Sequence, residues 1–124
     1  MNNKDSAVLI IAHGSRQKST EKTLEYITER VKTLLPERKI RLAFMEFGER
    51  TIEGELEKLA AEGEKTILAA PYFLFDGMHL RVDIPEVLAK FSGAHPDITA
   101  QLCKPLGTDD RLADIMVDRI LGGA

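Results

Sequence analysis

Residues 7–16 read AVLIIAHGSR, an apolar run that ends at a histidine and a glycine. A second apolar run, TILAA, occupies residues 66–70. Apolar runs without polar alternation are typical of parallel strands that are covered on both faces. We therefore expect these two segments to be central strands of a parallel sheet.

Strand-like runs alternate with helix-like patterns along the rest of the chain. The expected strands cover Ala7–Ala12, Ile40–Met45, Thr66–Phe73 and Ile98–Leu102, and the expected helices cover Ser19–Leu35, Thr51–Glu62, Asp83–Phe91 and Asp109–Leu121. This alternation predicts an α/β fold with helices on both faces of the sheet. Right-handed crossovers favour a four-stranded parallel sheet in the flavodoxin-like order 2-1-3-4. Asp83, followed by Pro85 and Glu86, indicates a capped start of the third helix.

Composition limits the classes of function. The 124 residues fit one domain spanning residues 1–124, and a net charge of -3 from 17 basic and 20 acidic residues gives no basic surface for nucleic acid or membranes. No run approaches the roughly 20 apolar residues of a membrane span, and the first residues lack a signal-peptide pattern. The single Cys103, interpreted as a small buried hydrophobe, fits a reducing compartment. We expect a cytoplasmic protein.

Three residues with metal-binding side chains, His13, Glu46 and His79, lie 33 positions apart, each just after a predicted strand. The carboxyl ends of parallel strands share one edge of the sheet, and ligands bind there where the strand order reverses, between the first and third strands. Two imidazoles and a carboxylate suit Co, Ni, Fe or Zn better than Mg or Ca. Taken singly, His13 could equally be a strand-end histidine bonded to backbone, and Glu46 a solvated acid.

The loop Leu74–Leu80 carries Phe75, Met78 and Leu80 where polar turn residues are usual. Such residues indicate walls for a flat, partly apolar ligand or a subunit contact, or else a loop that folds back onto the core. Basic residues flank the predicted crevice and are able to pair with ligand carboxylates: Arg16, Lys18 and Arg81. The third histidine, His95, lies in a polar turn and is interpreted as solvated.

Four segments together resemble a known family. They are LIIAHGSR (9–16), FMEFGERTIEGELEKL (44–59), APYFLFDGMHLRVDIPEVLAKF (70–91) and PLGTDDRLADIMVDRI (105–120). In this order they resemble the class II tetrapyrrole chelatases of the sirohydrochlorin cobaltochelatase type, including the related nickel and iron enzymes. The third segment is the most specific part of the resemblance.

The resemblance implies a lyase-class chelatase that inserts a divalent metal into sirohydrochlorin, in cobalamin or siroheme-type biosynthesis. The metal would be Co²⁺ first, with Ni²⁺ or Fe²⁺ as alternatives, and it would be a substrate rather than a permanently bound cofactor. His13, Glu46 and His79 would bind or deliver the metal and manage the pyrrole protons. Because many relatives carry two such domains, the resemblance also implies a short form that works as a homodimer.

The ring substrate would contact residues around this edge. Backbone amides of Gly14 and Ser15, near the start of the first helix, would receive ring carboxylates together with Arg16. Met78 and Leu80 would lie against the ring plane, and the set is completed by Gly77 and Arg81.

Two other functions compete with this one. A non-catalytic metal or tetrapyrrole carrier would use the same ligands, although Glu46 favours catalysis. A histidine phosphatase is disfavoured because Ala12, rather than an arginine, precedes His13.

Overall fold

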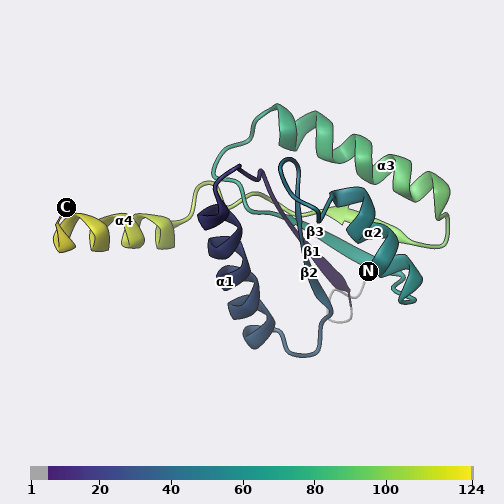
Figure 1. The fold of residues 1–124 in the computed structure, drawn as a ribbon, viewed down its shortest axis with the longest axis horizontal. Coiled ribbons are helices and arrows are strands. Elements are labelled where there is room, and N and C mark those ends of the chain that lie inside the picture. Colours follow the sequence, from purple (N-terminus) through teal and green to yellow (C-terminus); the bar gives the residue numbers. More distant parts are fainter. Residues whose placement is uncertain (1–5, 124) are drawn as a thin grey trace.

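The computed structural model describes residues 6–123 and contains a parallel sheet flanked by helices (Figure 1). The strands are β1 (Ala7–Ala12), β2 (Ile40–Phe44), β3 (Thr66–Pro71) and β4 (Thr99–Leu102). The helices are α1 (Lys18–Leu34), α2 (Ile52–Ala61), α3 (Ile84–Ala94) and α4 (Asp110–Gly122), and a π-helical turn, η2 (His79–Asp83), leads directly into α3. The predicted domain also takes in residues 1–5 and 124, which lie outside the described residues.

The strand order is β2-β1-β3-β4, as predicted. β1 pairs in parallel with both β2 and β3, so that Ile10 lies opposite Leu42 on one side and Ala70 on the other. Every residue of β1 is buried, as expected of a strand covered on both faces. The strand order therefore reverses between β1 and β3, where the sequence predicts the ligand crevice.

Two apolar layers cover the two faces of the sheet. α2 and α3 lie on one face and α1 lies on the other (Figure 1). Buried residues on the α2/α3 face include Leu9, Ile11, Leu56, Ile67 and Ile84. On the α1 face, the buried residues are Val8, Ile10, Ala12, Leu24, Ile40, Leu42 and Phe44. Alternate residues of each strand thus point to opposite layers, which confirms the predicted helices on both faces.

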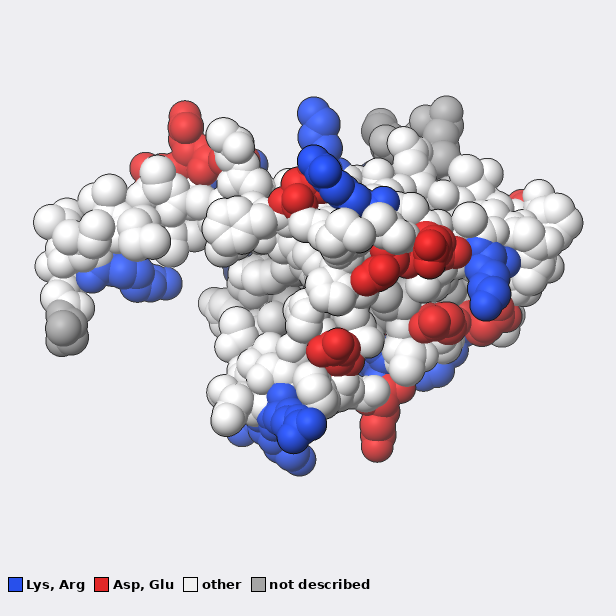
Figure 2. Space-filling view, turned by 90° about the horizontal axis from the view of Figure 1, so that it is seen from above, with Lys and Arg blue, Asp and Glu red and all other residues white. Residues whose placement is uncertain are grey.

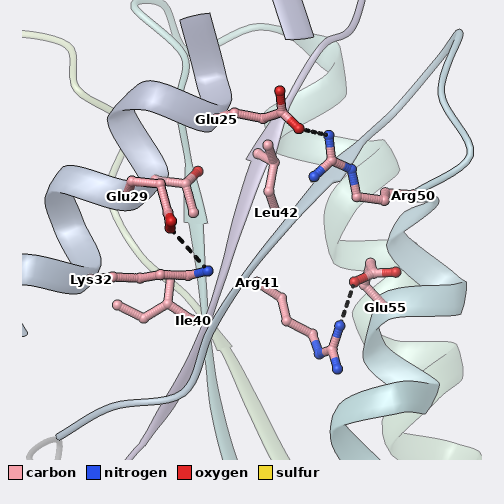
Figure 3. Close-up of a pocket in the computed structure, with 9 residues that line it drawn as sticks. Glu25, Glu29, Lys32, Ile40, Arg41, Leu42, Arg50 and Glu55 are labelled. Carbon is pink, nitrogen blue, oxygen red and sulfur yellow. Dashed lines mark hydrogen bonds and ion pairs between the residues drawn. The ribbon is translucent and has the colours of Figure 1, made fainter. Parts of the chain in front are cut away.

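Charged side chains line β2, the strand at one edge of the sheet, in a hollow of about 320 Å³ between α1 and α2 (Figure 3). Arg41 lies 3.2 Å from the carboxylate of Glu55 and 2.8 Å from that of Glu62. Arg50 pairs with Glu25 at 3.2 Å. The hydrogen bond from Arg41 lowers the pKa of Glu62. Charges along an edge strand oppose pairing with another chain, so we interpret this hollow as structural.

The third helix begins differently from the prediction. Asp83 was expected to cap it, but Asp83 has helical backbone angles (φ -67, ψ -48) and makes no capping hydrogen bond. The reason is that η2 continues into α3 without a break, so Asp83 lies inside a helical segment and its carboxylate is available to another group. Pro85 lies in the first turn of α3, as predicted.

The last helix, α4, contains no buried residue and projects from the body of the molecule (Figure 1). Within the described residues, no helix is long and apolar enough to cross a membrane.

Candidate functional site

His13 follows β1 and is held beside Glu46 by backbone pairing that continues past the strands. The amide of Met45 donates to the carbonyl of Ala12 at 3.0 Å, and the amide of Glu46 donates to the carbonyl of His13 at 3.0 Å. Gly14 has φ +93, and a Cβ at this position would lie 2.0 Å from the carbonyl oxygen of Glu46. Glycine is therefore required here by the close approach of two backbones.

His79 is placed by η2. The carbonyl of Gly77 accepts hydrogen bonds from the amides of Leu80 and Arg81 at 3.1 and 2.9 Å, which begins the turn. One helical turn later, the carboxylate of Asp83 lies 2.8 Å from Nδ1 of His79. Sequence reasoning missed Asp83 as a site residue, although the i, i+4 spacing of His79 and Asp83 was a usable signal. A carboxylate on the far nitrogen of a histidine orients the ring and makes it a better metal ligand.

The two histidines meet at the carboxyl edge of the sheet. Nε2 of His13 lies 3.2 Å from Nε2 of His79, and the angle between the planes of the two rings is 76°. Asp83 accepts at Nδ1 of His79, so this nitrogen carries the proton and Nε2 presents its lone pair. Nδ1 of His13 faces the carbonyl of Gly14 at 3.4 Å, which favours the same tautomer. This distance suits either a hydrogen bond between the two Nε2 atoms, with the proton on one of them, or a metal ion that both nitrogens coordinate.

The separation of the two nitrogens also fits a shared metal ion. Two nitrogen ligands at about 2.1 Å from one ion, at a tetrahedral angle, lie roughly 3.4 Å apart. The observed Nε2–Nε2 distance of 3.2 Å is close to this value. The histidine pair is thus already arranged as two of the ligands of a divalent transition metal, and it leaves the remaining coordination positions to other donors.

Glu46 lies beside His13 but not beside His79. Its carboxylate is 4.0 Å from Nδ1 of His13, on the opposite side of the ring from Nε2. Among residues 6–123, no group of three or more His, Cys, Asp and Glu side chains is arranged to hold a metal ion. The structure therefore does not assemble the expected three-ligand set. Because it lies at the other ring nitrogen, Glu46 is placed to orient His13 or to exchange a proton with it.

An apolar rim surrounds the histidine pair. An open hollow of about 270 Å³ is lined by His13, Tyr72, Phe73, Leu74, Phe75, Gly77 and His79. Phe75 is 81% exposed and the nearby Met78 is 69% exposed, which is unusual for such large apolar side chains. This rim suits a flat, partly apolar ligand.

Leu80 does not belong to the rim. It is 4% exposed and packs in the core on the α2/α3 face, so the expectation that it would lie against a ligand is wrong. In η2 the residue after His79 points into the core. For Leu80, the alternative given above is therefore correct: this part of the loop folds back onto the core. Arg81 remains exposed and pairs with Asp76 at 3.2 Å.

The segment after His13 is arranged differently from a helix N-terminus. α1 begins at Lys18, and the hydroxyl of Ser15 accepts a hydrogen bond from the amide of Gln17 at 3.1 Å. The amides of Gly14 and Ser15 thus precede the helix, outside the first turn where its dipole acts most strongly. The guanidinium of Arg16 stacks 5.0 Å from the ring centre of Phe47, an aromatic residue that sequence reasoning did not single out.

Two other candidate residues lie in different surroundings. Nε2 of His95 is 3.0 Å from both carboxylate oxygens of Glu57, and its ring lies 4.7 Å from that of Phe91. His95 is therefore a paired histidine rather than a solvated one. Cys103 is partly buried, and burial raises the pKa of its thiol.

The strand order and the histidine pair at its reversal define a class of doubly wound α/β proteins that bind a ligand at the switch point. Comparison with known proteins identifies the family within this class. The chain belongs to the CbiX family, whose model matches residues 7–122. This confirms the resemblance to the class II chelatases that was drawn from the sequence.

The relatives of this chain include proteins named as metal chelatases. The sirohydrochlorin cobaltochelatase of Methanocaldococcus jannaschii is 30% identical, over 94% of this chain and 98% of the relative. The sirohydrochlorin ferrochelatase of Priestia megaterium is 33% identical, over 92% of this chain but only 43% of the relative. Among solved structures, the sirohydrochlorin chelatase SirB from Bacillus subtilis subspecies spizizenii in complex with cobalt matches with a TM-score of 0.90 and 28% identity, over 97% of this chain and 51% of that one.

Proposed function

We propose that this chain is a sirohydrochlorin chelatase, a lyase that inserts a divalent metal into a tetrapyrrole. The observation that carries the proposal is the pair of Nε2 atoms, 3.2 Å apart, within an apolar rim at the switch point of the sheet. Relatives include both cobalt and iron enzymes. We propose Co²⁺ as the metal, with Ni²⁺ and Fe²⁺ as alternatives, in a pathway of the cobalamin or siroheme type.

Metal insertion exchanges a hydrated divalent ion for two protons on the pyrrole nitrogens. The ion enters between His13 and His79 and replaces the contact between their Nε2 atoms. Two protein ligands leave most of its coordination positions to water, and pyrrole nitrogens replace that water one at a time. A pair of ligands also releases the ion more readily than a complete protein cage would.

The two released protons need acceptors close to the metal. Once the ion has moved into the ring, the Nε2 atoms of the histidine pair are again free to take up protons. The carboxylate of Asp83 lies 2.8 Å from Nδ1 of His79 and holds this ring in place by a hydrogen bond. Glu46, 4.0 Å from Nδ1 of His13, is a second carboxylate beside the pair, and the partial exposure of both histidines lets the protons pass on to water.

The tetrapyrrole lies against the apolar rim in this proposal. Phe75 and Met78 contact the ring plane, while Gly77 allows the ring to approach the loop. Arg16 and Arg81 receive ring carboxylates, with the amides of Gly14 and Ser15 as further donors. For Arg81, a ring carboxylate would replace Asp76, its present partner at 3.2 Å.

The proposal also retains the homodimer and the cytoplasmic location expected from the sequence. The alignment with the Methanocaldococcus relative covers 98% of that protein, whereas this chain covers about half of SirB. This difference supports a short form in which two copies do what one longer chain does elsewhere.

The test is anaerobic insertion of Co²⁺, Ni²⁺ or Fe²⁺ into sirohydrochlorin by a trace of protein, followed by the visible spectrum of the ring. The wild type should accelerate insertion over many turnovers, and His79→Ala should lose this activity. His95→Ala is a matched control because it removes a histidine that pairs with Glu57 outside the site. Binding of metal or ring without acceleration would instead identify a carrier, and full activity in His79→Ala would remove the histidine pair from the mechanism.

A further inference from the structure

Phe47 has an unusual backbone conformation. Its φ of +58 lies in the left-handed region, and among residues 6–123 it is the one non-glycine residue with a positive φ. This region is unfavourable for a residue with a Cβ, and a bulky side chain is rare there. Strained residues of this kind cluster at functional sites, where the surrounding structure forces the conformation. The strain at Phe47 lies one residue from Glu46, beside the histidine pair.

Backbone pairing on both sides of Phe47 forces the conformation. The amide of Glu46 donates to the carbonyl of His13 at 3.0 Å, so the chain follows β1 up to this point. The amide of Phe44 donates to the carbonyl of Arg50 at 2.8 Å, so the chain then has to return to the end of β2. Phe47 lies at the reversal between these two bonds. Glycine is the residue that adopts such a conformation without strain.

The phenyl ring of Phe47 does not serve the hydrophobic core. Phe47 is 55% exposed, whereas Phe44 is 4% exposed and packs on the α1 face of the sheet. A phenylalanine at position 47 therefore neither suits the backbone nor fills the core. Within the described part of the chain, its ring makes one contact with a charged or aromatic group, and that group is Arg16. This contact is the feature that sets phenylalanine apart from glycine here.

Arg16 lies over the phenyl ring of Phe47 and has no acidic partner. Its guanidinium carbon is 5.0 Å from the ring centre, within the range of a cation–π contact. The side chain is exposed, and none of the carboxylates in residues 6–123 pairs with it. The planar guanidinium carries N–H donors in a fork that matches a carboxylate. Arg16 is thus held in place by an uncharged group while its hydrogen-bond donors remain available to an anion.

The acids near Phe47 are engaged by other groups. Glu21 lines the same small cleft as Phe47, but its carboxylate pairs with Arg50 at 2.8 Å. Glu46 precedes Phe47 in the chain, but its carboxylate lies beside the histidine pair. Arg50 therefore draws Glu21 away from the arginine that stacks on Phe47. The arrangement leaves Arg16 as a cation for a ligand rather than for the protein itself.

The second arginine at this edge is less available. Arg81 pairs with Asp76 at 3.2 Å, so a ligand carboxylate has to displace an acid before it binds there. No such displacement is needed at Arg16. On the face seen in Figure 2, side chains of both charges are interspersed rather than gathered into a basic patch. An anionic ligand is then held by individual cations placed for it rather than by a general positive field.

We propose that Phe47 is a positioning residue for binding of the tetrapyrrole. Its phenyl ring holds Arg16, and the guanidinium of Arg16 receives a carboxylate of the tetrapyrrole beside the histidine pair. The backbone strain persists because glycine at position 47 would relieve it but would leave the arginine without its stack. This inference deepens the proposed chelatase function and rests on it, since it takes the carboxylates of the tetrapyrrole as the anion.

The test is the affinity for metal-free sirohydrochlorin, titrated with protein and followed by the visible spectrum of the tetrapyrrole. Phe47→Leu keeps an apolar side chain but removes the aromatic face, so it should weaken binding about two- to five-fold. Arg16→Ala should weaken binding about ten-fold or more, because it removes a hydrogen bond to a charged group. Tyr26→Leu makes a similar change at an exposed aromatic residue of α1 and should bind as the wild type does.

Coupling between the two residues distinguishes a positioning role from a direct contact. In the Arg16→Ala background, Phe47→Leu should cause no further loss, because the phenyl ring has no guanidinium left to hold. The loss in Phe47→Leu should also diminish at high salt, since it acts through a charge. An equal loss in both backgrounds would mean that Phe47 contacts the tetrapyrrole itself or acts through the fold. That result would overturn the proposal, and so would full affinity in Phe47→Leu.

The strain is tested by Phe47→Gly, because glycine adopts the left-handed conformation freely. This variant should unfold at about the temperature of the wild type or higher, while it binds the tetrapyrrole as weakly as Phe47→Leu does. A large fall in melting temperature would mean that the phenyl ring stabilises the fold, which would overturn the proposal.

These affinities separate the inference from the chelatase proposal. A wild type that binds the tetrapyrrole but inserts no metal would be a carrier, and the variants would still decide the role of Phe47. A wild type that inserts metal, beside a Phe47→Leu variant of full affinity, would overturn the positioning role alone. A wild type that binds no tetrapyrrole would overturn both proposals.

Discussion

Gly14→Ala is the substitution whose effect the structure defines most closely. Its Cβ would lie 2.0 Å from the carbonyl oxygen of Glu46, whereas real Cβ atoms essentially never approach within 3.0 Å of another atom. The two backbones must therefore separate by at least about 1 Å. That displacement breaks the hydrogen bond of 3.0 Å from the amide of Glu46 to the carbonyl of His13.

The free energy of unfolding should fall by about 2–3 kcal/mol. Roughly 1–2 kcal/mol comes from alanine in the left-handed region at φ +93. About 1 kcal/mol more comes from the broken backbone hydrogen bond. For a chain of this size the sum corresponds to a fall in melting temperature of roughly 10 °C. The same displacement moves Glu46 away from His13, so metal insertion should decrease as well.

The assay is urea and thermal unfolding of Gly14→Ala beside Gly77→Ala. Gly77 lies in the same site, but a Cβ there meets nothing within 4 Å and no left-handed φ is involved. Its stability should change by less than about 0.5 kcal/mol. A Gly14→Ala protein as stable as Gly77→Ala would refute the close approach of the two backbones and the role that it gives to the glycine.

Three further predictions test individual side chains. Glu46→Gln should lower the rate of metal insertion more than the affinity for the ring; equal losses in both would indicate a purely structural acid. Asp83→Ala should weaken metal binding about 10–100-fold in titrations, while Asp76→Ala should not, because only Asp83 contacts a histidine of the site. Arg41 holds the pKa of Glu62 below its usual 4.5, so the stabilising contribution of Glu62 is present above that value and is lost as the pH falls below it. Glu62→Gln should therefore reduce the loss of stability in urea between about pH 5 and 3, and an unchanged profile would contradict the pairing.

Most of the fold could be predicted from local patterns. The runs at Ala7–Ala12 and Thr66–Pro71 are apolar at every position or nearly so, which is typical of central parallel strands, although only β1 is buried at every residue while β3 alternates between buried and partly buried residues. Short right-handed connections then leave few strand orders, and the predicted order is the observed one. The convergence of His13 and His79 follows directly, since both come after strands that lie side by side and point the same way.

The roles of single side chains in the site were harder to predict, because they depend on which way each one leaves the backbone. Glu46 was placed beside His13 correctly, yet its carboxylate lies at the wrong ring nitrogen for a shared metal. The sequence predicts Asp83 as a helix cap and Leu80 as part of the ligand surface, and both predictions are wrong. Both errors have one cause: a helical turn precedes α3 where the sequence analysis expects a loop.

The sequence by itself determined the sheet, its order, the family, and the edge at which the chemistry-bearing residues gather, because periodicity and short connections act locally along the chain. Only the tertiary structure decided that two Nε2 atoms face each other at 3.2 Å, that Asp83 orients one of the histidines, and that α4 contains no buried residue. The contact between the two histidines joins residues 66 positions apart, and the contact of Asp83 with His79 depends on the helical turn η2 that the chain forms before α3. Distances of a few tenths of an ångström at such contacts are set by the whole fold rather than by any one segment.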